Sequence, residues 1–223
     1  MIETPLGAHI VFHFGPVPLT TPVITTWGLV AVLGLAAWLL TRRLTIQPGR
    51  IQAVIELLVT TIVTQSREAT QHDGRPFLPL IGTLFLFVLS ANAITILPGI
   101  DAPTGHIETA GALAFIVFLS IHWYGIRRRG LIGYLKSFAK PTVLMLPINI
   151  ISEVTRILSL MVRLFGNIMS GGFVVAIVVA LAGLFVPVPL MALELVVGVV
   201  QAYIFAVLSA VFIGAAIGPG TTS

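Results

Sequence analysis

The chain has 223 residues, of which 57% are hydrophobic and only 9% are charged. Soluble domains carry roughly 25% charged residues, so this composition excludes an ordinary soluble protein and is typical of a helical protein that crosses a membrane several times. The net charge of +4 indicates bases that orient the chain in a membrane rather than a nucleic-acid site, and the lack of cysteine excludes disulfides and thiolate metal sites.

The first predicted span covers residues 23–40 and ends at the basic pair Arg42–Arg43. By the positive-inside rule, we expect this end in the cytoplasm and the amino terminus outside. Residues 48–71 repeat apolar side chains at helical spacing on one face, and polar residues such as Gln52 and Glu56 interrupt them. This pattern predicts an amphipathic helix on or near the inner surface.

Two further spans are predicted at residues 77–97 and 110–126. The loop between them carries acidic residues but no Lys or Arg, so we expect it outside. The second of these spans ends at Arg127–Arg129, which we expect on the inner side.

The last part of the chain predicts two long helices, residues 143–181 and 190–217, with a turn at Pro187. The first would be about 58 Å long, whereas the hydrocarbon core is about 30 Å thick, so we expect two steeply inclined antiparallel helices. Folding this pair about Pro187 sets Arg163 opposite Ala210 or Val211. The expected fold is an all-α membrane protein of about five membrane helices and one amphipathic helix, in a single domain over residues 1–223.

Arg163 is a cation inside the first long apolar helix. A charged side chain at this depth costs about 2.5–3.5 kcal/mol, so it indicates a function. Arg156 has a local counter-charge, because Glu153 lies three residues earlier and the two are expected to form an ion pair. Arg163 has no obvious carboxylate in this sequence, which predicts a carboxylate on a partner protein.

The strongly polar side chains of this helix share one face, within a sector of about 120° at 100° per residue. The stripe consists of Asn149, Ser152, Glu153, Arg156, Ser159, Arg163, Asn167 and Ser170. Lipid cannot satisfy such a row, so it must face other protein or a water-filled channel. For the three serines, hydrogen bonds between helices are the favoured explanation.

The following helix carries Glu194 and Gln201, seven residues apart and therefore on nearly the same face. An ionisable carboxyl group in an apolar helix suits a proton relay. The alternative is a structural glutamate that is hydrogen bonded to a neighbouring helix.

At these residues the chain resembles subunit a of F-type ATP synthases. The resemblance rests on Arg163–Asn167 preceded by Leu146–Ile150, and on Glu194 followed by Gln201–Leu208. A third match runs from Thr83 to Gly99. Together these matches extend the resemblance over essentially the whole chain.

The resemblance implies a role for each matching residue. Arg163 corresponds to the stator arginine that faces a rotor ring of c subunits, whose carboxylates supply the missing counter-charge. Glu194 corresponds to the relay of the outer half-channel, Gln201 to a glutamine near the arginine, and Asn167 to a polar residue one turn beyond it. The family's second relay position falls on Gly172, where this chain has no ionisable group.

The implied protein is a non-catalytic stator subunit with two offset half-channels, which load and unload protons on the ring carboxylates and which Arg163 separates. We expect Asn149, Ser152 and Glu153 to line the inner half-channel. The expected partners are the c ring, b-type peripheral stalk subunits, the rest of the ATP synthase and membrane lipid. No cofactor, metal, nucleotide or nucleic-acid site is expected, and the expected location is a bacterial inner membrane.

Two alternatives remain open at this point. A sodium-coupled form of the same subunit is one, because the choice of ion lies mainly in the c subunit. The other is an independent secondary transporter in which Arg163 binds an anionic solute, although the sequence shows no internal repeat.

Overall fold

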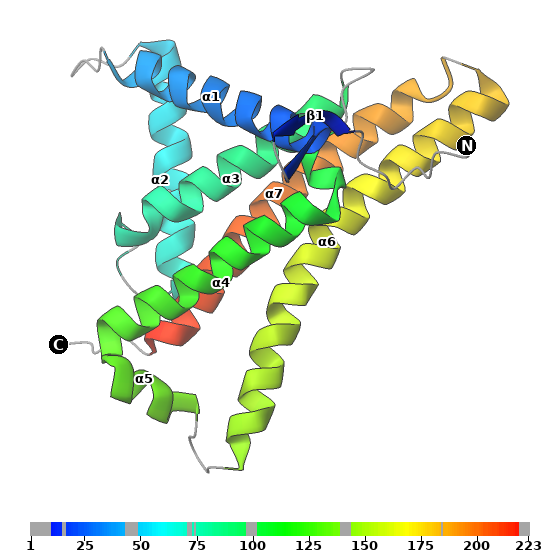
Figure 1. Cartoon of the computed structure of the whole chain (residues 1–223). Helices are drawn as coiled ribbons and strands as arrows, with labels where there is room; N and C mark the ends of the chain where they lie inside the picture. Colours follow the sequence, from blue (N-terminus) through cyan, green and yellow to red (C-terminus); the bar gives the residue numbers. More distant parts are fainter. Residues whose placement is uncertain are drawn as a thin grey trace.

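A computed structural model of the chain describes residues 10–14, 17–42, 49–70, 73, 75–96, 102–138, 144–183 and 185–218. A short antiparallel strand pair comes first, and helices follow (Figure 1). The elements are β1 (Ile10–Phe14), β2 (Val17–Thr20), α1 (Thr21–Thr41), α2 (Arg50–Thr70), α3 (Leu78–Ala93), α4 (Ile107–Arg129), α5 (Leu131–Phe138), α6 (Met145–Ala182) and α7 (Val188–Ile217). Three single 3₁₀ turns are η1 (Arg75–Phe77), η2 (Ile94–Ile96) and η3 (Pro103–Gly105).

Five helical segments of the described chain are long and apolar enough to cross a membrane. They are α1, η1 with α3, α4, α6 and α7. This confirms the expected all-α membrane fold, and the chain is a multi-pass integral membrane protein. The predicted amphipathic helix is α2, although the predicted end residues Pro48 and Gln71 lie outside the described residues.

Helix α7 lies at the centre of the bundle, where α2, α3 and α4 all pack against it. Helices α6 and α7 run in opposite directions from their shared turn, at the upper right of Figure 1, and α4 packs against both. Large side chains from four helices fill the core between them, including Val88, Ile121, Leu164 and Phe205, each less than 2% exposed. These contacts fix the positions of α6 and α7, which carry the residues of functional interest.

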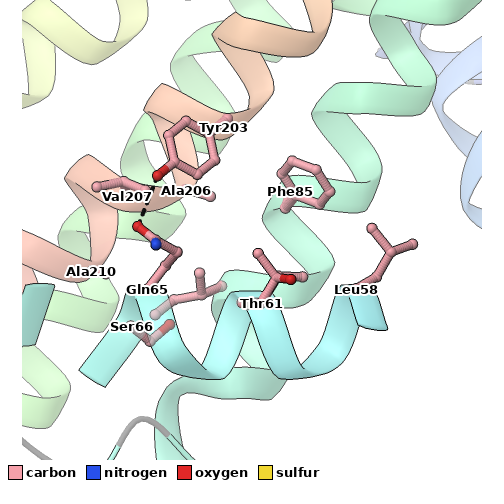
Figure 2. Close-up of a pocket in the computed structure, with 11 residues that line it drawn as sticks. Leu58, Thr61, Gln65, Ser66, Phe85, Tyr203, Ala206, Val207 and Ala210 are labelled. Atoms are coloured by element: carbon pink, nitrogen blue, oxygen red, sulfur yellow. Dashed lines mark hydrogen bonds between the residues drawn. The ribbon is translucent and has the colours of Figure 1, made fainter. Parts of the chain in front are cut away.

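A hydrogen bond joins α2 to α7, so α2 is part of the bundle. The Tyr203 hydroxyl donates to Oε1 of Gln65 at 2.8 Å, beside a small cavity of about 60 Å³ between α2, α3 and α7 (Figure 2). Ile62 of α2 also packs against the core. The apolar face of the amphipathic helix therefore contacts protein as well as any lipid around it.

Asn92 forms a buried polar network that connects α3, η3 and α7. Its Nδ2 donates to the Gly198 carbonyl at 2.9 Å, and its Oδ1 accepts a hydrogen bond from the Thr104 hydroxyl at 3.1 Å. A Cβ atom on Gly198 would lie 2.9 Å from the Cβ of Asn92, so this close approach of α3 to α7 requires glycine. The network satisfies polar groups that would otherwise be costly to bury.

Two elements of the structure were not predicted from the sequence. One is the β1–β2 hairpin, and the other is α5, a helix of eight residues. Helix α5 follows Gly130, whose φ of 73° reverses the chain after α4. A segment so short has too few turns to produce a clear periodic pattern, and α5 nevertheless contributes to the site described below.

Candidate functional site

Arg163 is exposed on the surface of α6. Within the described part of the chain, its guanidinium forms no hydrogen bond and no ion pair. The neighbouring Leu160 and Leu164 are buried in the core, which holds this turn of the helix firmly in place. The cation therefore lies next to the buried face of α6 and remains free to meet a group from outside the chain.

A polar cavity of about 360 Å³ opens at the amino-terminal end of α6. Four side chains of the polar stripe line it, namely Asn149, Ser152, Glu153 and Arg156. Helices α4, α5 and α7 supply the other walls. The structure thus brings the three residues expected in the inner half-channel into one cavity.

The ionic groups of this cavity are arranged around Glu153. Its Oε2 accepts from Nη1 of Arg156 at 3.3 Å, and its buried Oε1 has no hydrogen-bond partner among the described residues. The Arg156 guanidinium also lies 5.4 Å from the centre of the Phe212 ring on α7. Asn149 has a structural contact, since its Nδ2 donates to the Phe138 carbonyl of α5 at 2.8 Å. One buried carboxylate oxygen is therefore without a hydrogen-bond partner in the described part of the chain.

Tyr134 of α5 also lines the cavity, and sequence reasoning missed it. Burial and the nearby Glu153 carboxylate raise the pKa of Tyr134 to about 12, so its phenol is neutral at physiological pH. Its ring packs so closely on α4 that a Cβ atom on Gly125 would lie 2.5 Å from Cε2. The sequence shows only an aromatic residue after Gly130. It does not place Tyr134 in the cavity, because that position depends on α5 folding back beneath α4.

Glu194 of α7 lies against α6 near the opposite end. A Cβ atom on Gly171 would lie 2.8 Å from the carboxyl carbon of Glu194 and would overlap its Oε1. At the next position, Gly172, an added Cβ would meet nothing within 4 Å. The absent side chain at Gly171 therefore makes room for the Glu194 carboxyl group, which has no hydrogen-bond or ion-pair partner among the described side chains.

Two contacts determine how α6 and α7 align, and they correct the expected register. Gly171 lies beside Glu194, and Arg156 lies over Phe212. Between these contacts, Arg163 falls at the level of Tyr203 and not at that of Ala210 or Val211. The expectation was wrong because it centred the fold on Pro187, whereas the two contacts centre it near Gly183, directly after α6 ends at Ala182.

Gln201 is thereby within one helical turn of the Arg163 level. Its side chain is buried, and its Nε2 has no hydrogen-bond partner among the described residues. No hydrogen bond joins it to Arg163 in that part of the chain. Asn167 is half-buried one turn beyond Arg163, and its backbone carbonyl accepts a hydrogen bond from the Ser170 hydroxyl at 3.1 Å.

Along α6, the three polar features follow one another in order. The cavity with Arg156 comes first, Arg163 lies about 10 Å further along the axis, and the Glu194 carboxyl beside Gly171 lies about 12 Å beyond that. An exposed cation thus separates two regions that contain a carboxyl group. This arrangement suits the controlled movement of protons or small cations past a partner that carries the opposite charge.

Comparison with known proteins agrees with this arrangement. The family described as ATP synthase A chain matches residues 23–214. A protein named ATP synthase subunit a 2, from a Bradyrhizobium species, is 58% identical over 218 residues, which cover 98% of each chain. ATP synthase subunit a of Albidiferax ferrireducens is 45% identical over 93% of this chain and 90% of its own. ATP synthase subunit a 2 of a Picosynechococcus species is 46% identical over the same shares. With the matched segment reaching from α1 to the last turn of α7, this chain belongs to the ATP synthase A chain family.

Proposed function

We propose that the chain is the stator subunit of an F-type ATP synthase that conducts protons to and from a rotating c ring. Family membership supports a place in the ATP synthase complex, since the matching proteins are named as its subunit a. The single observation that carries the finer proposal is Arg163, which is exposed and has no partner among the described residues, between the Glu194 carboxyl and the polar cavity. Peripheral stalk subunits of the b type complete the assembly.

In the outer half-channel, a proton passes Glu194 and neutralises a carboxylate of the ring. The neutral carboxyl group then enters the lipid, where a charged one would be costly. Gly171 of α6 favours a relay role for Glu194, because it leaves space for the Glu194 carboxyl group of α7. This space lies next to Gly172, where the family has its second relay position. One carboxyl group from α7 thus substitutes for a side chain that α6 lacks.

In the inner half-channel, the proton leaves the ring after nearly a full turn. The cavity lined by Asn149, Ser152 and Glu153 receives it. The free Oε1 of Glu153 accepts it there, and the ion pair with Arg156 holds the carboxylate in position. Tyr134 keeps its own proton, so it does not relay charge in this cavity.

Arg163 separates the two half-channels. Its guanidinium is permanently charged, so it stabilises the ionised ring carboxylate and repels a proton that would pass directly between the channels. A membrane potential supplies about 2.3 kcal/mol per proton per 100 mV, which biases the ring in one direction. In this proposal, the chain is one membrane domain of a bacterial inner membrane, with the amino terminus outside and the carboxyl terminus inside.

Replacement of Arg163 tests the central step. We expect Arg163→Ala to abolish ATP synthesis driven by a proton gradient in reconstituted vesicles, while the complex still assembles. Arg67→Ala, which removes an exposed arginine at the end of α2, is the matched control and should keep wild-type rates. If the Arg163→Ala complex made ATP at the control rate, the proposed role of the arginine would be rejected.

A further inference from the structure

A third pocket lies away from the proton path, where the carboxy-terminal ends of α4 and α7 meet at the lower left of Figure 1. Its volume is about 540 Å³, which is in the range of small-ligand sites. Arg127 and Arg128 of α4 supply its positive groups, Asp73 supplies one carboxylate, and Trp123 with Phe77 forms an apolar wall. None of these residues takes part in the function proposed above.

The two arginines are available to a ligand. In the described part of the chain, neither Arg127 nor Arg128 forms a hydrogen bond or an ion pair, and both side chains are exposed. The third arginine of the run is already engaged, since Nε of Arg129 donates to the Ile217 carbonyl at 2.7 Å. Arg129 thereby offsets the partial negative charge at the end of α7 and leaves its two neighbours free.

The pocket lies at the depth of lipid headgroups. Helix α4 has 23 residues and is about 34 Å long, slightly more than the hydrocarbon core of about 30 Å. Its basic last turn therefore reaches the polar layer. Trp123 is 65% exposed one turn earlier, as expected for an aromatic side chain at the membrane interface. The Tyr124 hydroxyl donates to the Pro76 carbonyl at 3.4 Å and holds the wall together.

The charges of the pocket select among headgroups. Two guanidinium groups and one carboxylate give a net charge of +1, which matches a headgroup with one phosphodiester and no ammonium group. Guanidinium groups bind phosphate oxygens with paired hydrogen bonds. The Asp73 carboxylate, which accepts from the Arg75 backbone N–H at 3.3 Å, can also accept from a hydroxyl group of the ligand. A glycerol headgroup supplies such hydroxyl groups, and a choline headgroup does not.

We propose that this pocket binds the headgroup of an anionic phospholipid of the phosphatidylglycerol type. The phosphodiester lies against Arg127 and Arg128, the glycerol hydroxyls donate to Asp73, and the acyl chains leave past the exposed ring of Trp123. The bound lipid then bridges α4 and the segment before α3, next to the end of α7.

Binding of short-chain phosphatidylglycerol to the assembled complex tests this site. The complex is titrated with dihexanoyl phosphatidylglycerol in a neutral detergent, and native mass spectrometry counts the bound lipid. We expect Arg127→Gln/Arg128→Gln to weaken this binding about thirtyfold, because each basic residue near anionic headgroups contributes a similar share of the binding free energy and two are removed. Arg67→Gln/Lys136→Gln removes two exposed bases elsewhere and should bind as the wild type does.

Two further variants address assembly and selectivity. Arg127→Lys/Arg128→Lys keeps the charge that orients α4 but lacks the paired hydrogen bonds, so its binding should be intermediate. Asp73→Asn should reduce the preference for phosphatidylglycerol over dihexanoyl phosphatidylcholine.

Several results would overturn the proposal. One is equal lipid binding by the wild type and by Arg127→Gln/Arg128→Gln, and another is equal binding of the two lipids by the wild type. A third is displacement of the lipid by millimolar inorganic phosphate, which would indicate a general anion site. Absence of lipid binding by the wild-type complex would also reject the lipid site, since a neighbouring subunit would then cover the pocket.

Discussion

The lack of a side chain at Gly171 of α6 determines where the Glu194 carboxyl group of α7 can lie. The carboxyl group of Glu194 occupies the space that a Cβ atom at position 171 would take, whereas position 172 is open. In an exposed helix, replacement of glycine by alanine normally stabilises by about 1 kcal/mol. The two adjacent glycines of α6 therefore have opposite expectations for the same substitution.

We predict that Gly171→Ala slows proton flux about tenfold or more, because the new methyl group displaces the Glu194 carboxyl from its position. Gly172→Ala is the matched control and should keep normal flux. The measurement is passive proton uptake by vesicles that contain the membrane sector alone. Adding Glu194→Asp to Gly171→Ala shortens the displaced side chain and should restore part of the flux. Equal rates for the two alanine variants would mean that this contact has no role in conduction.

Single residues differ in how readily the sequence discloses them. The Glu153–Arg156 pair is separated by three positions on one helix, so its spacing alone places the charges together, and they lie 3.3 Å apart. Arg163 was conspicuous because a charge in an apolar helix is costly. Tyr134 and Gly171 could not be found in this way, because their significance comes from contacts with other helices that no local pattern encodes.

At the scale of elements, the end of α7 depends on a residue from α4. Gly218 ends the helix with a φ of 87°, and the Arg129 guanidinium lies against it. Arg129 caps the helix, because its Nε donates to the Ile217 carbonyl. The last carbonyl groups of a helix lack partners within the helix, so this hydrogen bond satisfies one of them.

We predict that Arg129→Gln loosens the last turn of α7. The lost hydrogen bond involves a charged donor and should lower the local free energy of opening by about 1–2 kcal/mol. Faster hydrogen exchange at the backbone amides of residues 214–217 would reveal the change. Lys136→Gln, at an exposed position of α5, should leave exchange there unaltered. If both variants exchanged at the wild-type rate, the α4–α7 hydrogen bond would contribute nothing to the end of the helix.

The sequence located the long elements well and their packing poorly. The spans expected at 110–126 and 190–217 correspond to α4 (Ile107–Arg129) and α7 (Val188–Ile217), because uninterrupted apolar segments have clear ends. The alignment of α6 with α7 was wrong by about two turns, because side-chain contacts such as Arg156 over Phe212 determine it. Hydropathy reports which segments enter the membrane but not how their faces meet.

For the whole molecule, the basic residues at the ends of α1 and α4 bear on how the chain is oriented in a membrane. Arg42 lies at the end of α1, and Arg127–Arg129 lie at the end of α4, whose first turn carries the acidic Glu108. Arg43 and Lys140 belong to the same basic groups but lie outside the described residues. By the positive-inside rule, these basic groups predict one orientation for all five spans, with the amino terminus outside.

We predict that the two ends of α4 are accessible from opposite sides of the membrane. The chain has no cysteine, so single cysteines at exposed Lys136 and Glu108 report on one position each. In intact cells, an impermeant maleimide should label Glu108→Cys but not Lys136→Cys, and inverted vesicles should show the reverse pattern. The three arginines of α4 remain in both variants, so neither substitution removes the charge that sets the orientation. The reverse labelling in cells would show that the chain has the opposite orientation in the membrane. The proposed assignment of Glu194 to the outer half-channel and of Glu153 to the inner one would then be exchanged. Labelling of both positions from one side would mean that α4 does not cross the membrane.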